Sequence, residues 1–241
     1  MITATAMTHV GLVRERNEDS LVLPGLVSFG SLPGPLAVRY PPSAGPLTFA
    51  VVDGMGGHRG GQVASRLVAQ HLADNATAGA VEVLADANRL LYAEMQRTPH
   101  LTGMGATIAG ALLASGTATI FNVGDARVYQ FCGGYLMLLS TDDRVRPGSN
   151  VVTQSLGGSD RPANIEPHIR EISLGDEQRL LICSDGLSEA VDFSSIETVL
   201  AEMSTEKATV TLLQAALQAG AADNVSLIIL DCVEEGLRYD S

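Results

Sequence analysis

LTFAVVDGMGGHRGG, residues 47–61, is an apolar run that ends in one aspartate and continues into a glycine-rich segment. Residues 47–52 predict a buried strand, because six apolar or β-branched residues follow one another without a charge. A carboxylate at the edge of a core is unfavourable unless something compensates its charge. The sequence therefore raises the question of which group compensates the charge of Asp53.

The composition predicts one globular domain. The chain has 241 residues, of which 46% are hydrophobic and 17% are charged, and its formal net charge is −12. The acidic balance argues against a nucleic-acid-binding protein, which would normally carry a basic surface. We find no linker that would divide residues 1–241.

Cysteine usage and hydropathy favour a cytoplasmic location. Cys132, Cys183 and Cys232 are widely spaced, so we expect reduced thiols and neither a zinc nor a redox site. The N-terminus shows no signal-peptide pattern. The uncharged stretch 101–124 contains the turn signal Ser115-Gly116 and predicts a hairpin, not a membrane span.

Strand and helix patterns come in blocks. We expect strands within 7–23, at 47–52, in an antiparallel meander over 106–135, at 179–186 and at 225–232. The proline-rich segment 24–46 is either a plain surface connection or a β-excursion. Helical spacing predicts helices from about 63 to 72, 81 to 96, 193 to 203 and 205 to 219. This order favours an α+β fold in which helices cover antiparallel sheets.

Acidic residues follow or precede several of these strands. Each alone is typical of a turn, but strand ends that meet at one end of a sandwich would gather them. Clustered carboxylates need cations, and oxygen ligands prefer Mg²⁺ or Mn²⁺ to zinc. The glycine-rich segment does not fit a nucleotide loop, because it lacks the P-loop lysine and Arg59 interrupts the dinucleotide pattern. The candidate residues are Glu18, Asp19, Asp53, Asp125, Asp185 and Asp223.

Seven segments in order resemble one family. GLVRERNED, VVDGMGG, GAT, NVGDAR, TQSLGG, CSDGLSE and ADNVSLIIL are similar to the motifs of the metal-dependent protein serine/threonine phosphatases of type 2C, in their compact bacterial form. The resemblance spans nearly the whole chain. It implies a four-layer α-β-β-α sandwich, with two antiparallel sheets between pairs of helices.

The resemblance also implies a role for each candidate residue. Asp53 would bridge two Mn²⁺ or Mg²⁺ ions, with the Gly54 carbonyl on one of them. Arg14 would hold the substrate phosphate, with Arg16 as the alternative if the register differs. The other expected ligands are Asp185 and Asp223 for the first ion, Glu18 and Asp19 for the second, and Asp125 for a third, weaker ion.

The implied reaction is hydrolysis of phosphoserine and phosphothreonine in proteins by a water that two metal ions activate. Partners would be phosphorylated proteins and their Ser/Thr kinases, and we expect a monomer that binds neither nucleic acid nor membrane. Two alternatives stay open: an inactive phosphoprotein-binding adaptor, and a regulatory phosphatase of the sporulation or stress-response type. The adaptor is disfavoured because all the expected acids are present, and the regulatory type because the NED and GDAR segments match those of the general enzymes.

Two departures from the family pattern matter. Met55 stands where many eukaryotic members have a histidine, so we expect either His58 or a water to protonate the leaving group. The flap that usually follows the TDD-like motif is shortened to the segment between about 143 and 153. The excursion at 24–46 is either a substitute docking surface or an ordinary exposed loop.

Overall fold

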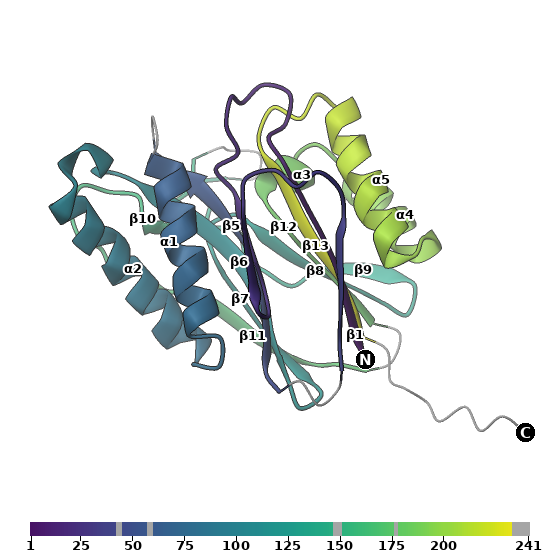
Figure 1. The fold of residues 1–241 in the computed structure, drawn as a ribbon. Coiled ribbons are helices and arrows are strands. Elements are labelled where there is room, and N and C mark those ends of the chain that lie inside the picture. Colours follow the sequence, from purple (N-terminus) through teal and green to yellow (C-terminus); the bar gives the residue numbers. More distant parts are fainter. Residues whose placement is uncertain (42–44, 57–59, 147–150, 176–177, 233–241) are drawn as a thin grey trace, which may run out of the picture.

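The computed structural model describes residues 1–41, 45–56, 60–146, 151–175 and 178–232. Within them, two antiparallel sheets stack face to face and helices cover both outer faces (Figure 1). This confirms the predicted α+β fold and its α-β-β-α layers. The prediction of one domain over 1–241 rests on the sequence alone.

Each sheet combines strands from distant parts of the chain. The first sheet has the order β4 (Leu36–Tyr40), β1 (Ile2–His9), β13 (Val225–Cys232), β12 (Gln178–Cys183), β8 (Arg127–Cys132), β9 (Tyr135–Leu138). The second has the order β11 (His168–Ser173), β7 (Thr117–Val123), β6 (Gly105–Ala114), β5 (Leu47–Met55), β2 (Ser20–Leu23), β3 (Leu26–Phe29), and β10 (Leu156–Gly157) pairs with β6.

The helices form the outer layers. Helices α1 (Gly60–Asp74) and α2 (Ala80–Arg97) pack on the second sheet, and α4 (Phe193–Glu202) and α5 (Thr205–Gln218) pack on the first. The side chain of Asp192 caps α4 by accepting a hydrogen bond from the Ser195 backbone N–H. The short α3 (Asp185–Ser188) follows β12, and a 3₁₀ turn (Pro99–Leu101) follows α2.

Strand β5 shows why both faces of the central strands are apolar. Phe49 and Val51 enter the core between the sheets, whereas Ala50 and Val52 face the core under α1 and α2. Successive side chains of a strand point to opposite faces, so a strand buried on both sides is apolar at every position. The run at 47–52 therefore encodes its place in the middle of the molecule.

The structure corrects two sequence-based expectations, the start of the first strand and the meander, and it bears out the β-excursion. Strand β1 begins at Ile2, well before residue 7. The excursion at 24–46 contains two strands, β3 and β4, which form edges of different sheets. The expected meander over 106–135 is wrong as a single unit, because β6 and β7 lie in the second sheet whereas β8 and β9 lie in the first. The chain changes sheets at the turn around Asp125.

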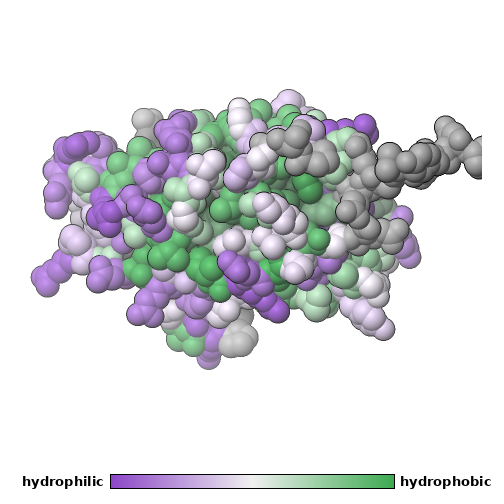
Figure 2. All heavy atoms as spheres, turned by 90° about the horizontal axis from the view of Figure 1, so that it is seen from below, coloured by the Kyte–Doolittle hydropathy of each residue, from purple (hydrophilic) through white to green (hydrophobic). Residues whose placement is uncertain are grey.

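Figure 2 views the lower end of the sandwich in Figure 1, where hydrophobic residues lie among hydrophilic ones. Hydrophilic residues gather on the side that carries α1 and α2. None of the helices in the described residues combines the length and the apolar composition that crossing a membrane requires.

We expect Leu180→Ala to lower the free energy of unfolding by about 2–5 kcal/mol, because it leaves a cavity in the core between the sheets. Leu180 is fully buried, whereas Leu138, in the same sheet, is 40% exposed. Urea denaturation should show a much smaller change for the matched variant Leu138→Ala. Equal losses for the two variants would contradict this placement of the core.

Candidate metal centre

The predicted acidic residues come from the ends of five strands. Asp53 lies near the end of β5, Asp125 follows β7, and Asp185 follows β12. Asp223 precedes β13, and Glu18 and Asp19 precede β2. We call the end of the sandwich that carries these six residues the acidic end. In Figure 1 it lies at the top, where α3 and the loop after β1 meet.

A cavity of about 860 Å³ opens at the acidic end. Five of the predicted acids line it, and the sixth, Asp19, lies just behind Asp53. The register explains this position: Ser20 pairs with Val52, so Asp19 stands opposite Asp53 at the end of the neighbouring strand. The other lining residues used below are Arg14, Arg16, Gly54, Met55, His100 and Glu189.

Asn224 fixes the loop 10–19 that carries Arg14 and Glu18. Its side-chain amide donates to the carbonyls of Val10 and Arg16, at 2.9 Å each, and its Oδ1 accepts from the Glu18 backbone N–H at 2.8 Å. The residue next to Asp223 therefore ties the first part of the chain to the last described strand. The sequence pattern did not reveal this anchoring role.

Gly54 is required by the packing of three backbone segments. A Cβ at this position would lie 2.1 Å from the Gly61 carbonyl oxygen and 2.7 Å from that of Glu18. Strand β5, the start of α1 and the loop before β2 can approach this closely only around a glycine. The close approach also brings Glu18 to the N-terminus of α1, where the Gln62 backbone N–H donates to its carboxylate.

The carboxyl groups raise one another's pKa values. Burial, followed by the charges of Asp19, Asp185 and Asp223, raises the pKa of Asp53 well above its usual range. Burial also raises the pKa values of Asp19 and Asp185 to about 7. Without compensating cations, the acidic end therefore takes up protons near neutral pH.

Two buried oxygens mark where a cation would fit. Asp19 Oδ1 and Asp185 Oδ1 are buried and have no hydrogen-bond partner among the described residues. The second oxygen of Asp19 accepts from the Ser226 hydroxyl at 2.5 Å, which fixes the orientation of the carboxylate. Unpartnered carboxylate oxygens in a site with oxygen donors fit a hard divalent ion such as Mn²⁺ or Mg²⁺.

Among the described residues, the side chains that could bind a metal are not close enough together to hold an ion. No group of three or more His, Cys, Asp or Glu side chains among them could hold an ion as they stand. Instead, Asp223 Oδ2 accepts from Arg14 Nη2 at 2.6 Å, and Asp185 Oδ2 lies 3.4 Å from Arg144 Nη2. The assignment of Asp53, Gly54 and the other acids as ligands therefore stays a prediction.

Arg144 is a site residue that the sequence did not reveal. Its Nε donates to Asp125 Oδ2 at 2.9 Å, and its Nη1 lies 2.5 Å from Glu189 Oε1. The side chain is only 4% exposed. Nothing in the local pattern TDDRV distinguishes this arginine from a solvated one. Glu189 could have been found, because it stands four residues after Asp185, at the C-cap of the short helix α3.

Two histidines are relevant to the question of which group protonates the leaving group. His58 lies outside the described residues, so its predicted role stays a prediction. His100, in the 3₁₀ turn after α2, lines the cavity and was missed because it follows a helix without any recognisable motif. Met55, at the position where the sequence resemblance places a histidine in many eukaryotic members, also lines the cavity.

Comparison with known proteins agrees with the fold. Residues 41–222 match the family described as Protein phosphatase 2C. The chain is 30% identical to the serine/threonine protein phosphatase PstP of Mycobacterium tuberculosis, in an alignment 256 positions long that covers 95% of this chain. The match covers 45% of PstP, so the chain spans about half the length of this curated relative.

Two solved structures of PstP resemble this fold. The crystal structure of the Mycobacterium tuberculosis protein superposes with a TM-score of 0.80 at 26% identity, covering 97% of this chain and 100% of that one. A PstP catalytic domain in complex with two manganese ions has a TM-score of 0.77 at 29% identity, with the same coverage of both chains. With a family match over most of its length and these relatives, the chain belongs to the protein phosphatase 2C family.

Proposed function

We propose that the protein is a metal-dependent protein phosphatase that hydrolyses phosphoserine and phosphothreonine in other proteins. The observation that carries the proposal is the acidic end: five acidic residues and Arg14 line one cavity, and Asp185 and the adjoining Asp19 each have a buried oxygen without a hydrogen-bond partner among the described residues. Membership of the 2C family supports the same reaction. A cavity of about 860 Å³ leaves room for a phosphorylated side chain.

The acids at the cavity would hold two Mn²⁺ or Mg²⁺ ions. Asp53 would bridge them, with the Gly54 carbonyl on one, and the remaining ligands would be Asp185 and Asp223 on one side and Glu18 and Asp19 on the other. When bound, such a pair of ions supplies an activated water and stabilises charge on a phosphoryl group. The manganese complex of a PstP domain supports this choice of ion.

Arg14 would orient the substrate. Its guanidinium lies at the mouth of the cavity, is 54% exposed and contacts Asp223. An arginine fork matches two phosphoryl oxygens, and an exposed side chain can exchange one carboxylate partner for a phosphate. Arg16, which also lines the cavity, is the neighbouring candidate.

The remaining parts of the proposal concern the cellular setting. We propose that residues 1–241 act as a single phosphatase domain and as a monomer in the cytoplasm, on targets of Ser/Thr kinases.

The shortened flap between about 143 and 153 includes residues 147–150, which lie outside the described residues. A third, weaker ion at Asp125 would have to compete with Arg144 for the carboxylate.

We expect Asp53→Asn to lower kcat/KM by roughly 10²-fold or more, because the variant loses the carboxylate that would bridge both ions. The assay uses p-nitrophenyl phosphate and then phosphothreonine peptides with Mn²⁺. Asp160 is exposed, so Asp160→Asn is the matched control and should keep full activity. A wild type without turnover under any divalent ion would favour the inactive adaptor.

Replacing Arg14 by alanine should raise KM for a phosphothreonine peptide by about tenfold or more and change kcat less, because the charge-assisted hydrogen bonds to phosphate are lost. Steady-state kinetics on one peptide measures this. Arg16→Ala is the comparison variant. If Arg16→Ala has the large effect and Arg14→Ala has none, the assignment of the phosphate-binding arginine is wrong.

Metal affinity should fall as the pH is lowered from 8 to 6. Asp19 and Asp185, whose pKa values burial raises to about 7, must release protons before they can bind an ion. Below that pKa, the affinity for the ion falls roughly tenfold per pH unit for each proton that the ion must displace. Titration calorimetry with Mn²⁺ at several pH values gives the slope, and Asp19→Asn should flatten it. An affinity independent of pH would refute the proton release.

The same raised pKa values determine how the stability of the metal-free protein changes with pH. A carboxyl whose pKa is higher in the folded state than in the unfolded state binds its proton more tightly when folded. The metal-free fold should therefore lose stability as the pH rises from about 4 to about 7. Thermal melts in a chelator should show this fall, and added Mn²⁺ should remove it.

A further inference from the structure

Every nitrogen of the Arg144 guanidinium faces a carboxylate. Nε donates to Asp125, Nη2 lies 3.4 Å from Asp185, and Nη1 lies 2.5 Å from Glu189. The Arg144 and Asp125 side chains are only 4% and 5% exposed. The three acids belong to two segments, the turn after β7 and the short helix α3. They converge on a single positive centre.

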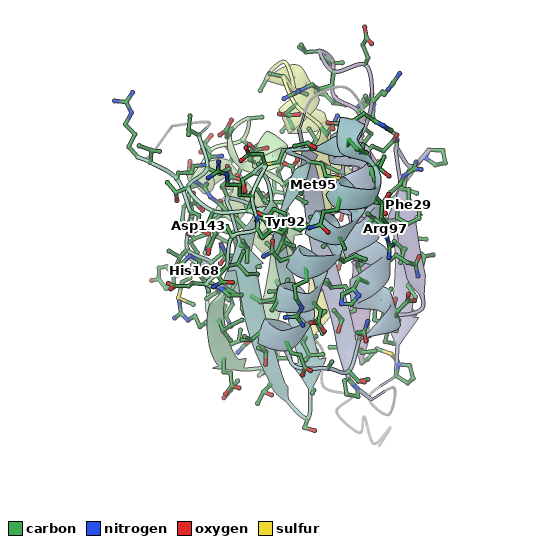
Figure 3. The ribbon with its side chains drawn as sticks, turned by 90° about the vertical axis from the view of Figure 1, so that its left-hand side faces the viewer. Phe29, Tyr92, Met95, Arg97, Asp143 and His168 are labelled. Carbon is green, nitrogen blue, oxygen red and sulfur yellow. The ribbon has the colours of Figure 1, made fainter. Side chains whose placement is uncertain are left out.

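The loop that carries Arg144 is held so that this side chain points inward. The preceding residue, Asp143, accepts hydrogen bonds from the Gly124 backbone N–H at 2.8 Å and from the Gln154 amide at 2.9 Å. His168 lies 2.8 Å from its other oxygen, and Figure 3 shows the two side chains next to each other. Arg144 also forms a backbone bridge with Val152. The base of the loop is therefore fixed on both sides.

We propose that Arg144 is a built-in cation that occupies the place where a third divalent ion would bind, so that the protein takes up two ions and not three. The inference rests on the proposed function, because it concerns the same acidic end. Carboxylate oxygens are the ligands that a hard divalent ion prefers, although among the described residues no three of these side chains stand at ion-binding spacing around Arg144. Here the guanidinium already neutralises them, and an additional cation would have to displace a buried, fully paired arginine.

The two oxygens of Asp185 face different cations, the Arg144 guanidinium and a divalent ion. Its Oδ2 faces Arg144, whereas its Oδ1 is buried and has no hydrogen-bond partner among the described residues. One oxygen is thus committed to the arginine and the other is left for an ion beside Asp53. Arg144 accordingly acts as a positioning residue, which orients Asp185 towards the pair of ions without touching the substrate.

The number of bound ions tests the inference directly. Equilibrium dialysis of the whole chain against Mn²⁺, followed by elemental analysis, should find two ions per chain in the wild type. Arg144→Met removes the charge and keeps much of the side-chain volume, so this variant should bind a third, weaker ion. The double variant Arg144→Met with Asp125→Asn should return to two ions, because the new site loses a ligand.

Two controls keep the test decisive. Arg146 stands on the same loop and is exposed, so Arg146→Met should leave the count at two. Arg144→Lys retains a cation and should also bind two ions, even if Arg144→Met does not fold. Circular dichroism melts report folding for each variant.

Three ions in the wild type, or an unchanged count in a folded Arg144→Met, would overturn the inference. So would a Mn²⁺-soaked crystal of the wild type in which an ion sits on Asp125 and Arg144 is displaced. These results would leave the proposed phosphatase activity intact. A wild type that binds no Mn²⁺ would instead overturn the metal pair on which both proposals depend.

Discussion

The central constraint on this protein is the burial of several carboxylates at one end of a sandwich. Asp19 and Asp125 are almost fully buried, and Asp53 and Asp185 are only partly accessible. Their mutual repulsion and the loss of hydration would favour protonation, and protonated acids bind metal poorly. The rest of the acidic end can be understood as the set of positive groups and hydrogen-bond donors that offsets this cost.

Two arginines meet this demand in different ways. Arg14 is exposed and contacts one carboxylate, so water or a metal ion can replace it on Asp223, and a phosphate can replace Asp223 as its partner, at little cost. Arg144 is buried and contacts three carboxylates, so removing it would leave uncompensated charge in the interior. Exposure therefore separates an exchangeable positive charge from a permanent one, although the two residues are chemically identical.

Much of the fold could be predicted because its signals are local. Each of these signals lies within a short stretch of sequence. They are the apolar strands at 47–52 and 225–232, the four long helices and the acidic turns. The pairing of β1 with β4 and the change of sheet between β7 and β8 could not be predicted, since both depend on contacts between distant segments. Arg144 escaped notice for the same reason: its three partners are 19, 41 and 45 positions away in the sequence.

The pairing of β1 with β13 has a consequence for biosynthesis. Strand β13 sits between β1 and β12, and Asn224, just before it, ties down the loop that follows β1. Until residues 223–232 have left the ribosome, the first strand lacks this neighbour and Asp223 is missing from the cavity. A nascent or prematurely terminated chain would therefore lack a complete acidic end.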